Sequence, residues 1–267
     1  MLRSLFTGIS GLRAHQQMLD ITSSNIANVN TVGYKSTSSV FEDTLSQTIG
    51  GAGAATATSG GTNPEQIGLG VQLASTQTNF AQGSNQYTGR GSDLLINGDG
   101  FFVLSNNGQQ TFTRAGSFSL DSVGHLVAPD GSIVQSAAGG NLNLTGLTTG
   151  AYVSWSISPT GDVNAVDSTG ATTTLDTIAT ATFPNPGGLA RIGDSQFQVS
   201  PNSGAAAIGT AGTGGRGKLT AGYVEMSNVD LASELTNLII SERGFQANSR
   251  VITTSDEVLQ SLISLKN

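Results

Sequence analysis

A glycine-rich segment near the end of the chain comes one residue short of a phosphate-binding loop. Residues 212–218 read Gly-Thr-Gly-Gly-Arg-Gly-Lys, and Leu219 follows them. A loop of this type needs Ser or Thr at that position to hold magnesium, and a helix whose N-terminus receives the phosphate. The residues after Leu219 have a strand-like pattern instead. We therefore interpret the segment as a plain loop and predict no nucleotide or other cofactor.

Other residues that carry chemistry are few and scattered. The two histidines, His15 and His125, lie on different predicted elements. Four aspartates occur at predicted turns, where this side chain hydrogen-bonds its own backbone: Asp93, Asp99, Asp121 and Asp130. The chain has no cysteine, so neither a disulfide nor a cysteine-based metal site can form. We predict no catalytic residue, no metal site and no enzymatic activity.

The charge balance and hydropathy exclude two classes of partner. The 267 residues carry 11 basic and 18 acidic side chains, for a net charge of −7. Binding to nucleic acid phosphates needs a basic stripe, so we expect no nucleic acid partner. No apolar stretch is long enough for a transmembrane helix, and we predict no membrane insertion. The apolar residues near the N-terminus are interrupted by polar ones, which is atypical of a cleaved export signal.

Heptad rows of apolar residues at the two ends of the chain predict two long helices. The N-terminal row consists of Leu5, Leu12, Leu19 and Ile26. The C-terminal row and its flanking positions comprise Leu235, Leu238, Phe245, Ile252, Leu259 and Leu262. Such a stripe keeps one face of a helix against a partner helix, and short isolated helices are marginal in water. We predict that these residues form an assembly interface.

The heptad rows allow packing within one chain or between chains. An ordinary core formed by the two helices of one chain is the simpler alternative. Polar residues near the stripes favour mainly intermolecular packing, because polar seam positions fix the register between helices; they are Gln16, Ser23, Ser241 and Asn248. On physical grounds alone, Asn25 and Asn28 are best interpreted as C-terminal caps of the first helix.

The middle of the chain has the pattern of a β-rich body. Short apolar runs recur at intervals of about ten residues, between turn residues such as Gly, Asn and Asp. Residues 97–100 read Asn-Gly-Asp-Gly between two apolar runs, which predicts a β-hairpin joining 94–96 to 101–104. The predicted fold class is thus α+β: two terminal heptad helices forming a coiled-coil-like domain, with an inserted, mainly antiparallel β body.

Boundaries follow from turn and cap residues. We predict a helical domain from residues 1–30 and 226–267, a connecting segment over 31–70 and a β body over 71–225. The first helix should end near Asn28, and Ser227 or Asn228 should cap the last helix, with Asp230 at its positively polarised N-terminus.

Several segments, in this order along the chain, resemble the signature of bacterial flagellar rod and hook proteins. The matching positions that we take as the family motif are Asn25, Asn28, Thr31, Gly33, Tyr34, Lys35, Asn97, Gly98, Gly100, Phe101 and Phe102. Further similarity lies in residues 112–118, 222–229 and 245–249. Within the family, residues 245–266 resemble the hook subunit more than the distal-rod subunit.

The resemblance implies a structural subunit of the flagellar hook, with the distal-rod (driveshaft) subunit as the alternative. A secreted β-rich adhesin with helical oligomerisation ends is a more distant alternative. The implied partners are other copies of the chain in a helical tube that transmits torque, and the adjoining rod, hook-cap and hook–filament junction proteins. The flagellar export apparatus is also implied as a partner. The implied location is the flagellar hook and basal body, outside the cytoplasm, reached without a cleaved signal.

Overall fold

The computed structural model describes residues 2–56, 60–106, 108–148 and 150–264, and the chain divides into two compact units. The terminal unit comprises Met1–Ala27, Thr37–Thr78 and Asp230–Asn267. The β unit comprises Asn28–Ser36 and Asn79–Val229. This arrangement, two terminal helices and a mostly antiparallel β body, confirms the predicted α+β class.

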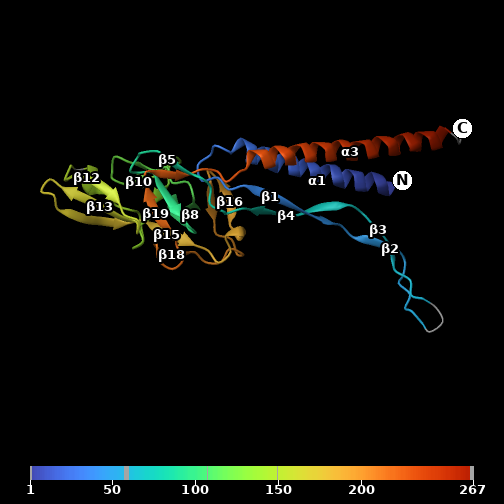
Figure 1. Ribbon diagram of the computed structural model, residues 1–267, viewed down its shortest axis with the longest axis horizontal. Helices are drawn as coiled ribbons and strands as arrows, with labels where there is room; N and C mark the ends of the chain where they lie inside the picture. The colour runs from blue at the N-terminus through green and yellow to red at the C-terminus, as the bar shows by residue number, and fades with distance from the viewer. Residues whose placement is uncertain (1, 57–59, 107, 149, 265–267) are drawn as a thin grey trace. The chain divides into compact units, whose positions relative to one another are not determined.

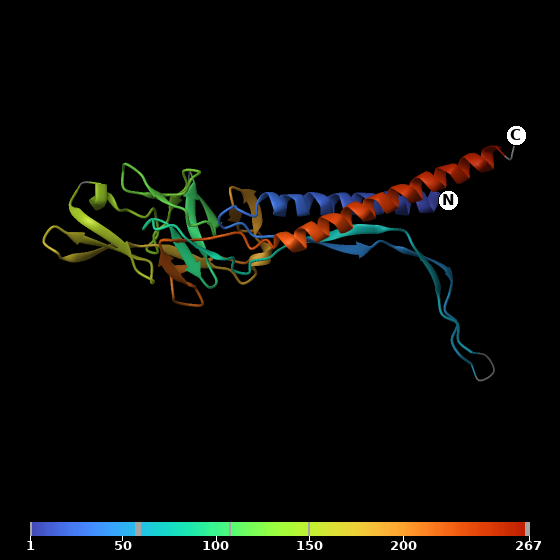
Figure 2. The same ribbon diagram turned by 45° about the horizontal axis from the view of Figure 1, so that its top comes forward.

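The terminal unit is built on two long antiparallel helices, α1 (Leu2–Ala27) and α3 (Leu231–Ser264). They lie side by side in Figures 1 and 2. α1 ends at Ala27, next to the predicted end near Asn28. α3 is capped by Asp230, whose Oδ1 accepts a hydrogen bond from the Ala232 N–H at 3.0 Å. The prediction that Ser227 or Asn228 caps this helix is therefore wrong.

A long two-stranded hairpin completes the terminal unit. In it β1 (Thr37–Asp43) pairs with β4 (Val71–Thr78), and β2 (Ser46–Gly50) pairs with β3 (Glu65–Gly68). The structure thus forms strands within residues 31–70, where the sequence predicted a connecting segment. Residues 57–59 of that segment lie outside the described residues. Thr, Ser, Val and Ile supply enough β propensity for the paired strands despite the low complexity around them.

The β unit contains short strands whose described pairings are all antiparallel. The strands before residue 150 are β5 (Asn85–Tyr87), β6 (Leu94–Asn97), β7 (Phe101–Asn106), β8 (Gln109–Thr113), β9 (Ser119–Leu120), β10 (Leu126–Val127) and β11 (Ile133–Val134). The later strands are β12 (Tyr152–Ile157), β13 (Asp162–Asp167), β14 (Thr172–Thr177), β15 (Ala179–Thr182), β16 (Ala190–Gly193), β17 (Gln196–Gln198), β18 (Ala207–Thr210), β19 (Lys218–Ala221) and β20 (Tyr223–Glu225). Two short helical segments are α2 (Thr145–Thr148) and η1 (Pro186–Gly188).

One nine-stranded sheet organises the β unit. Its main path runs β16-β17-β8-β7-β11-β10-β9, with β15 pairing both β7 and β18. Separate pairings are β12-β13-β14, β19-β6 and β20-β5. Alternate side chains of β7 serve two cores, as expected for a strand buried on both faces: Phe102 belongs to the larger apolar cluster and Phe101 to the smaller one.

The predicted hairpin at residues 97–100 is wrong. β6 pairs with β19, and β7 pairs with β8, β11 and β15, so the segment crosses between two sheets. Gly98 and Gly100 have φ values of 108° and 139°, far from those of a tight hairpin turn. Distant groups bind the backbone there: the Gly217 N–H donates to the Asp99 carbonyl at 2.6 Å, and Arg114 Nη2 donates to the Gly98 carbonyl at 2.8 Å.

Gly33 offers a direct test of the packing that fixes residues 28–36 in the β unit. Its φ is +68°, and a Cβ there would lie 2.3 Å from the Ala115 nitrogen. We predict that Gly33→Ala lowers the free energy of unfolding of the β unit by at least about 2 kcal/mol, through backbone strain and overpacking. Gly91→Ala is the control, because nothing lies within 4 Å of its added Cβ. Equal denaturant midpoints for the two variants would contradict this account.

Candidate assembly surface

Small side chains bring α1 and α3 into close contact. The buried positions of α1 are Gly8, Gly11, Ala14, Thr22 and Asn25, and among them Gly8, Gly11 and Asn25 lie against α3 at this seam. On α3 the seam includes fully buried Ser241 and half-buried Gly244 and Asn248. A Cβ on Gly8 would lie 3.3 Å from Ile252, and one on Gly11 would lie 2.7 Å from Asn248 Oδ1. The close approach therefore depends on glycine.

Polar groups lock the two helices to the hairpin near the end of α1. Asn25 is 1% exposed, and its Nδ2 donates to the Thr37 carbonyl at 2.8 Å and to Glu234 Oε1 at 2.9 Å. Its Oδ1 accepts from the Thr37 N–H at 3.1 Å. Asn25 is thus a tie between α1, α3 and β1, and its interpretation as a helix C-cap is wrong.

Most of the predicted heptad residues flank the seam, whereas Ile252 packs against Gly8 within it. Those that the structure leaves half-buried are Leu5, Leu12, Leu19, Ile26, Leu238, Ile252 and Leu259. Phe245, Leu235 and Leu262 are 37%, 47% and 48% exposed. Small and polar residues occupy the central positions, so these larger apolar side chains are left with surface that α1 and α3 do not cover.

Further apolar residues on the outside of the helices were missed by the sequence reasoning, because they lie off the heptad rows. They are Phe6 on α1 and Ile239, Ile240, Val251 and Val258 on α3, with exposed fractions of 41% to 68%. Leu231, Leu235 and Ile239 recur every four residues and so follow one flank of α3. We call the exposed apolar residues of α3 together its outer face; at about 100° per residue they lie on more than one side of the helix. This face is the candidate assembly surface.

The family-motif residues within 28–36 form a second, buried arrangement inside the β unit. Asn28 and Thr31 make a turn in which Thr31 Oγ1 donates to Asn28 Oδ1 at 3.0 Å. The guanidinium of Arg191 lies 4.6 Å from the centre of the Tyr34 ring. Lys35 is fully buried, and its Nζ donates to Glu225 Oε1 at 2.6 Å. Burial lowers the pKa of Lys35, and the charge of Glu225 opposes that shift.

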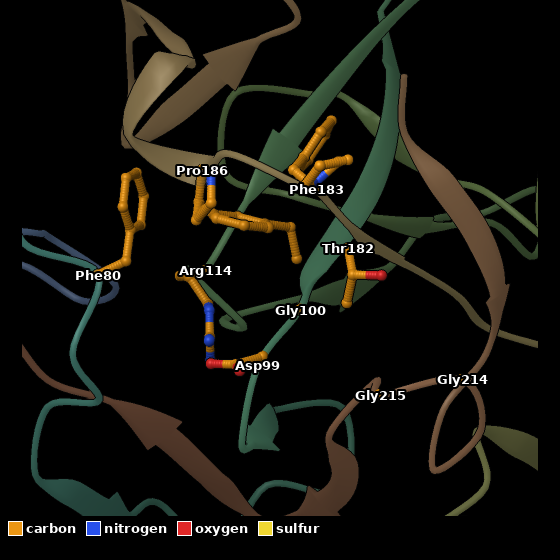
Figure 3. Close-up of a pocket in the computed structure, with 11 residues that line it drawn as sticks. Phe80, Asp99, Gly100, Arg114, Thr182, Phe183, Pro186, Gly214 and Gly215 are labelled. Atoms are coloured by element: carbon orange, nitrogen blue, oxygen red, sulfur yellow. The ribbon is translucent and has the colours of Figure 1, made fainter. Parts of the chain in front are cut away.

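Of the remaining motif residues, Gly100 and Phe101 line a cavity of about 360 Å³ in the β unit, shown in Figure 3. Rings of Phe80, Phe101 and Phe183 line it, and Arg114 reaches in toward Asp99. Phe102 and exposed Asn97 lie nearby in the sequence but do not line it. The Nη1 and Nη2 groups of Arg114 already donate to carbonyl groups and to Glu225, whereas its buried Nε has no hydrogen-bond partner among the described residues.

The residues first considered for chemistry do not converge. The His15 ring packs against Gly244 in the terminal unit, whereas His125 Nδ1 lies 2.9 Å from the Leu142 carbonyl oxygen in the β unit. Asp121 Oδ1 accepts from the backbone N–H groups of residues 123–125, which confirms the turn role predicted for it. Within the described residues, no group of three His, Cys, Asp or Glu could hold a metal ion.

In the glycine-rich loop at residues 212–218, the arginine side chain forms hydrogen bonds with neighbouring residues of the chain. Arg216 donates to the Thr210 carbonyl at 2.9 Å and to Thr213 Oγ1 at 2.9 Å. Strand β19 begins at Lys218, where a phosphate-binding loop would require a helix.

Among the described helices, none has both the length and the apolar character needed to cross a membrane.

Three family models match the chain. They are the flagella basal body rod protein over residues 5–35, the flagellar hook protein FlgE/F/G D1 domain over residues 95–165, and the flagellar basal body rod FlgEFG protein C-terminal domain over residues 220–265. The first and third cover most of α1 and α3. The second covers β7 to β12 and most of β13.

Curated relatives match over the full length. The chain is 48% identical to the flagellar basal-body rod protein FlgG of Bacillus subtilis and 38% identical to that of Caulobacter vibrioides, covering 100% of both chains in each case. It is 28% identical to the flagellar hook protein FlgE of Borreliella burgdorferi, over an alignment of 442 residues. The preference for the hook that residues 245–266 indicated is therefore not supported, and the similarity favours the rod.

Gly244 provides a test of the seam. Alanine is the better helix former by about 1 kcal/mol, but its Cβ would lie 2.3 Å from His15 Cε1. We predict a net loss of unfolding free energy for Gly244→Ala, because overpacking costs about 1–3 kcal/mol. Ser261→Ala, at an exposed position of α3, should be neutral or stabilising. Thermal unfolding followed by circular dichroism measures both; a stabilised Gly244→Ala would show that the seam is loosely packed.

The α3 cap predicts a specific acid dependence. Hydrogen bonds from the Ser233 side chain and from the Ala232 and Ser233 N–H groups lower the pKa of Asp230. The stability contributed by the cap is thus present above the ordinary Asp pKa of about 3.9 and is lost as pH falls through the lower folded pKa. Asp230→Asn keeps a good cap without this titration.

The protection of the first-turn amides of α3 against hydrogen exchange, relative to the intrinsic rate at each pH, should therefore fall in acid for the wild type and less for Asp230→Asn. Asp256→Asn, in the middle of α3, serves as the control and should follow the wild type. Identical acid profiles for the wild type and Asp230→Asn would contradict the assignment of the cap.

Proposed function

Since the chain belongs to the bacterial flagellar rod and hook protein family, we propose that it is a structural subunit of the distal rod. In this role the chain is not an enzyme. It polymerises with copies of itself into a helical tube that carries torque to the hook. Its other partners are the neighbouring rod and hook proteins and the flagellar export apparatus, and it leaves the cytoplasm without cleavage of a signal.

The outer face of α3 is the observation that supports polymerisation. A surface helix of a lone globular protein presents polar residues on the side away from its partner. α3 instead exposes Leu235, Ile239 and Val258 by 47%, 56% and 50%. Covering the exposed half of such a side chain stabilises an assembly by about 0.8–1.5 kcal/mol. A contact repeated from copy to copy without closing a ring generates a helical filament.

The relatives support the rod in preference to the hook. The 48% identity to a rod protein extends over the whole of both chains without a large insertion. The similarity to the hook protein of Borreliella burgdorferi falls to 28% over a longer alignment. A secreted adhesin has no support in these relatives.

Location separates the rod from the hook. We expect immunogold electron microscopy, with antibody against residues 79–229, to label the straight shaft of isolated basal bodies after the surrounding rings are removed. Label along the curved segment outside the cell would assign the chain to the hook. Label on neither structure would contradict both assignments.

Substitutions on the outer face test the surface itself. We predict that Leu235→Asp combined with Ile239→Asp raises the concentration needed for polymerisation by about 10-fold or more, because two apolar contacts are lost. The folded monomer should keep its circular dichroism, since both side chains are exposed. Gln246→Asp combined with Gln260→Asp adds the same charge to exposed polar positions of α3 and should assemble normally. Normal filaments from the Leu235 and Ile239 variant in sedimentation would exclude this face.

A further inference from the structure

One carboxylate holds two buried cations inside the β unit. Lys35, Arg114 and Glu225 are 0%, 3% and 1% exposed, and we call them the Glu225 cluster. Glu225 Oε1 lies 2.6 Å from Lys35 Nζ, and Glu225 Oε2 lies 3.3 Å from Arg114 Nη1. Burial lowers the pKa of Arg114, which the charges of Glu225 and Asp99 oppose.

The cluster joins segments that are far apart in the sequence. Glu225 Oε1 also accepts from the Gly83 N–H at 2.8 Å, and the Glu225 carbonyl accepts from the Gly33 N–H at 2.7 Å. Lys35 Nζ donates to the Ala81 carbonyl at 2.8 Å. Lys35 and Glu225 are separated by 190 positions, near opposite ends of the chain. The cluster therefore closes only when both end regions of the β unit are present together.

An incomplete cluster is strongly unfavourable. Removing one partner of a buried ion pair leaves an uncompensated charge in a medium that solvates it poorly, which destabilises much more than the intact pair stabilises. Without Glu225, two cations would be buried with no carboxylate in hydrogen-bond contact. In any partly folded chain from which Glu225 is missing, Lys35 and Arg114 therefore stay in water. The β unit then does not close.

We propose that Glu225 is a closing latch: during passage through the export channel, the β unit cannot close until both Lys35 and Glu225 have left the channel. This inference rests on the proposed function, because only an exported subunit has to remain open during passage. It holds for either direction of passage, since Lys35 and Glu225 emerge far apart in time. The same latch delays closure during synthesis until residue 225 has been added.

The Glu225→Gln substitution in the full-length chain removes the carboxylate charge while keeping the shape of the side chain. The single tryptophan, Trp155, packs against the larger core cluster, so its fluorescence reports on the β unit. We expect the unfolding equilibrium constant of this unit to rise by about 100-fold or more in Glu225→Gln at neutral pH. Glu257→Gln, an exposed carboxylate of α3, is the matched control and should change nothing.

Charge and shape are separated by two further measurements. Adding Lys35→Met to Glu225→Gln removes one of the uncompensated cations and should lower the unfolding equilibrium constant of the β unit at least about tenfold. Raising the pH should also restore the stability of the Glu225→Gln variant, because neutral Lys35 needs no counter-ion. Wild-type stability in Glu225→Gln, or a loss that neither Lys35→Met nor alkaline pH relieves, would overturn the latch.

These measurements use purified monomer, so they are independent of where the protein is placed in the cell. If the unfolding measurements overturn the latch but the gold label lies on the rod, the proposed function remains intact. A confirmed latch with label on neither the rod nor the hook would leave a folding mechanism without the export role.

Discussion

Close approach of α1 and α3 through glycine and small polar residues is the constraint that shapes the terminal unit. Gly11 and Gly244 leave room only for the Asn248 and His15 side chains opposite them. Apart from His15 and Ile252, which pack against glycines of the seam, the large residues lie on the flanks of the seam and on the outer face. The pairing of the helices thus decides which apolar surface remains available to other copies of the chain.

The buried polar residues of the family motif have separate structural tasks. Asn25 joins both helices to the hairpin, whereas Gly33 and Lys35 fix the following segment in the β unit. Asn25 and Lys35 bond through their side chains to partners distant in sequence, so a substitution at either leaves a buried group unpaired elsewhere. Gly33 bonds through its backbone N–H and is required instead because its lack of a Cβ permits the close contact with Ala115. A signature of short polar residues is thereby explained through the tertiary contacts it makes.

Sequence periodicity was sufficient for the two helices and for the α+β class, because the heptad rows span many turns. It did not identify the seam, since the leucines that dominate the pattern lie beside it and Gly8 and Gly11 carry no apolar signal. Local rules also failed at residues 97–100, where Arg114 and Gly217 bind the backbone and override the hairpin preference. Burial of Lys35 had no local signal, because its counter-ion lies 190 positions away. The tail resemblance to the hook was outweighed by similarity over the full length.

The unequal lengths of the two helices give the terminal unit a projecting end. Gly8 faces Ile252; about 9 Å of α1 precedes Gly8, whereas about 18 Å of α3 follows Ile252. Figure 2 shows α3 extending beyond the N-terminal end of α1. The projection carries Leu262 and Ile263, which are 48% and 65% exposed. In a stack of copies, the projecting end of α3 would overlap the next subunit on one side only. The two ends of the polymer would then be chemically different, and growth would have a direction.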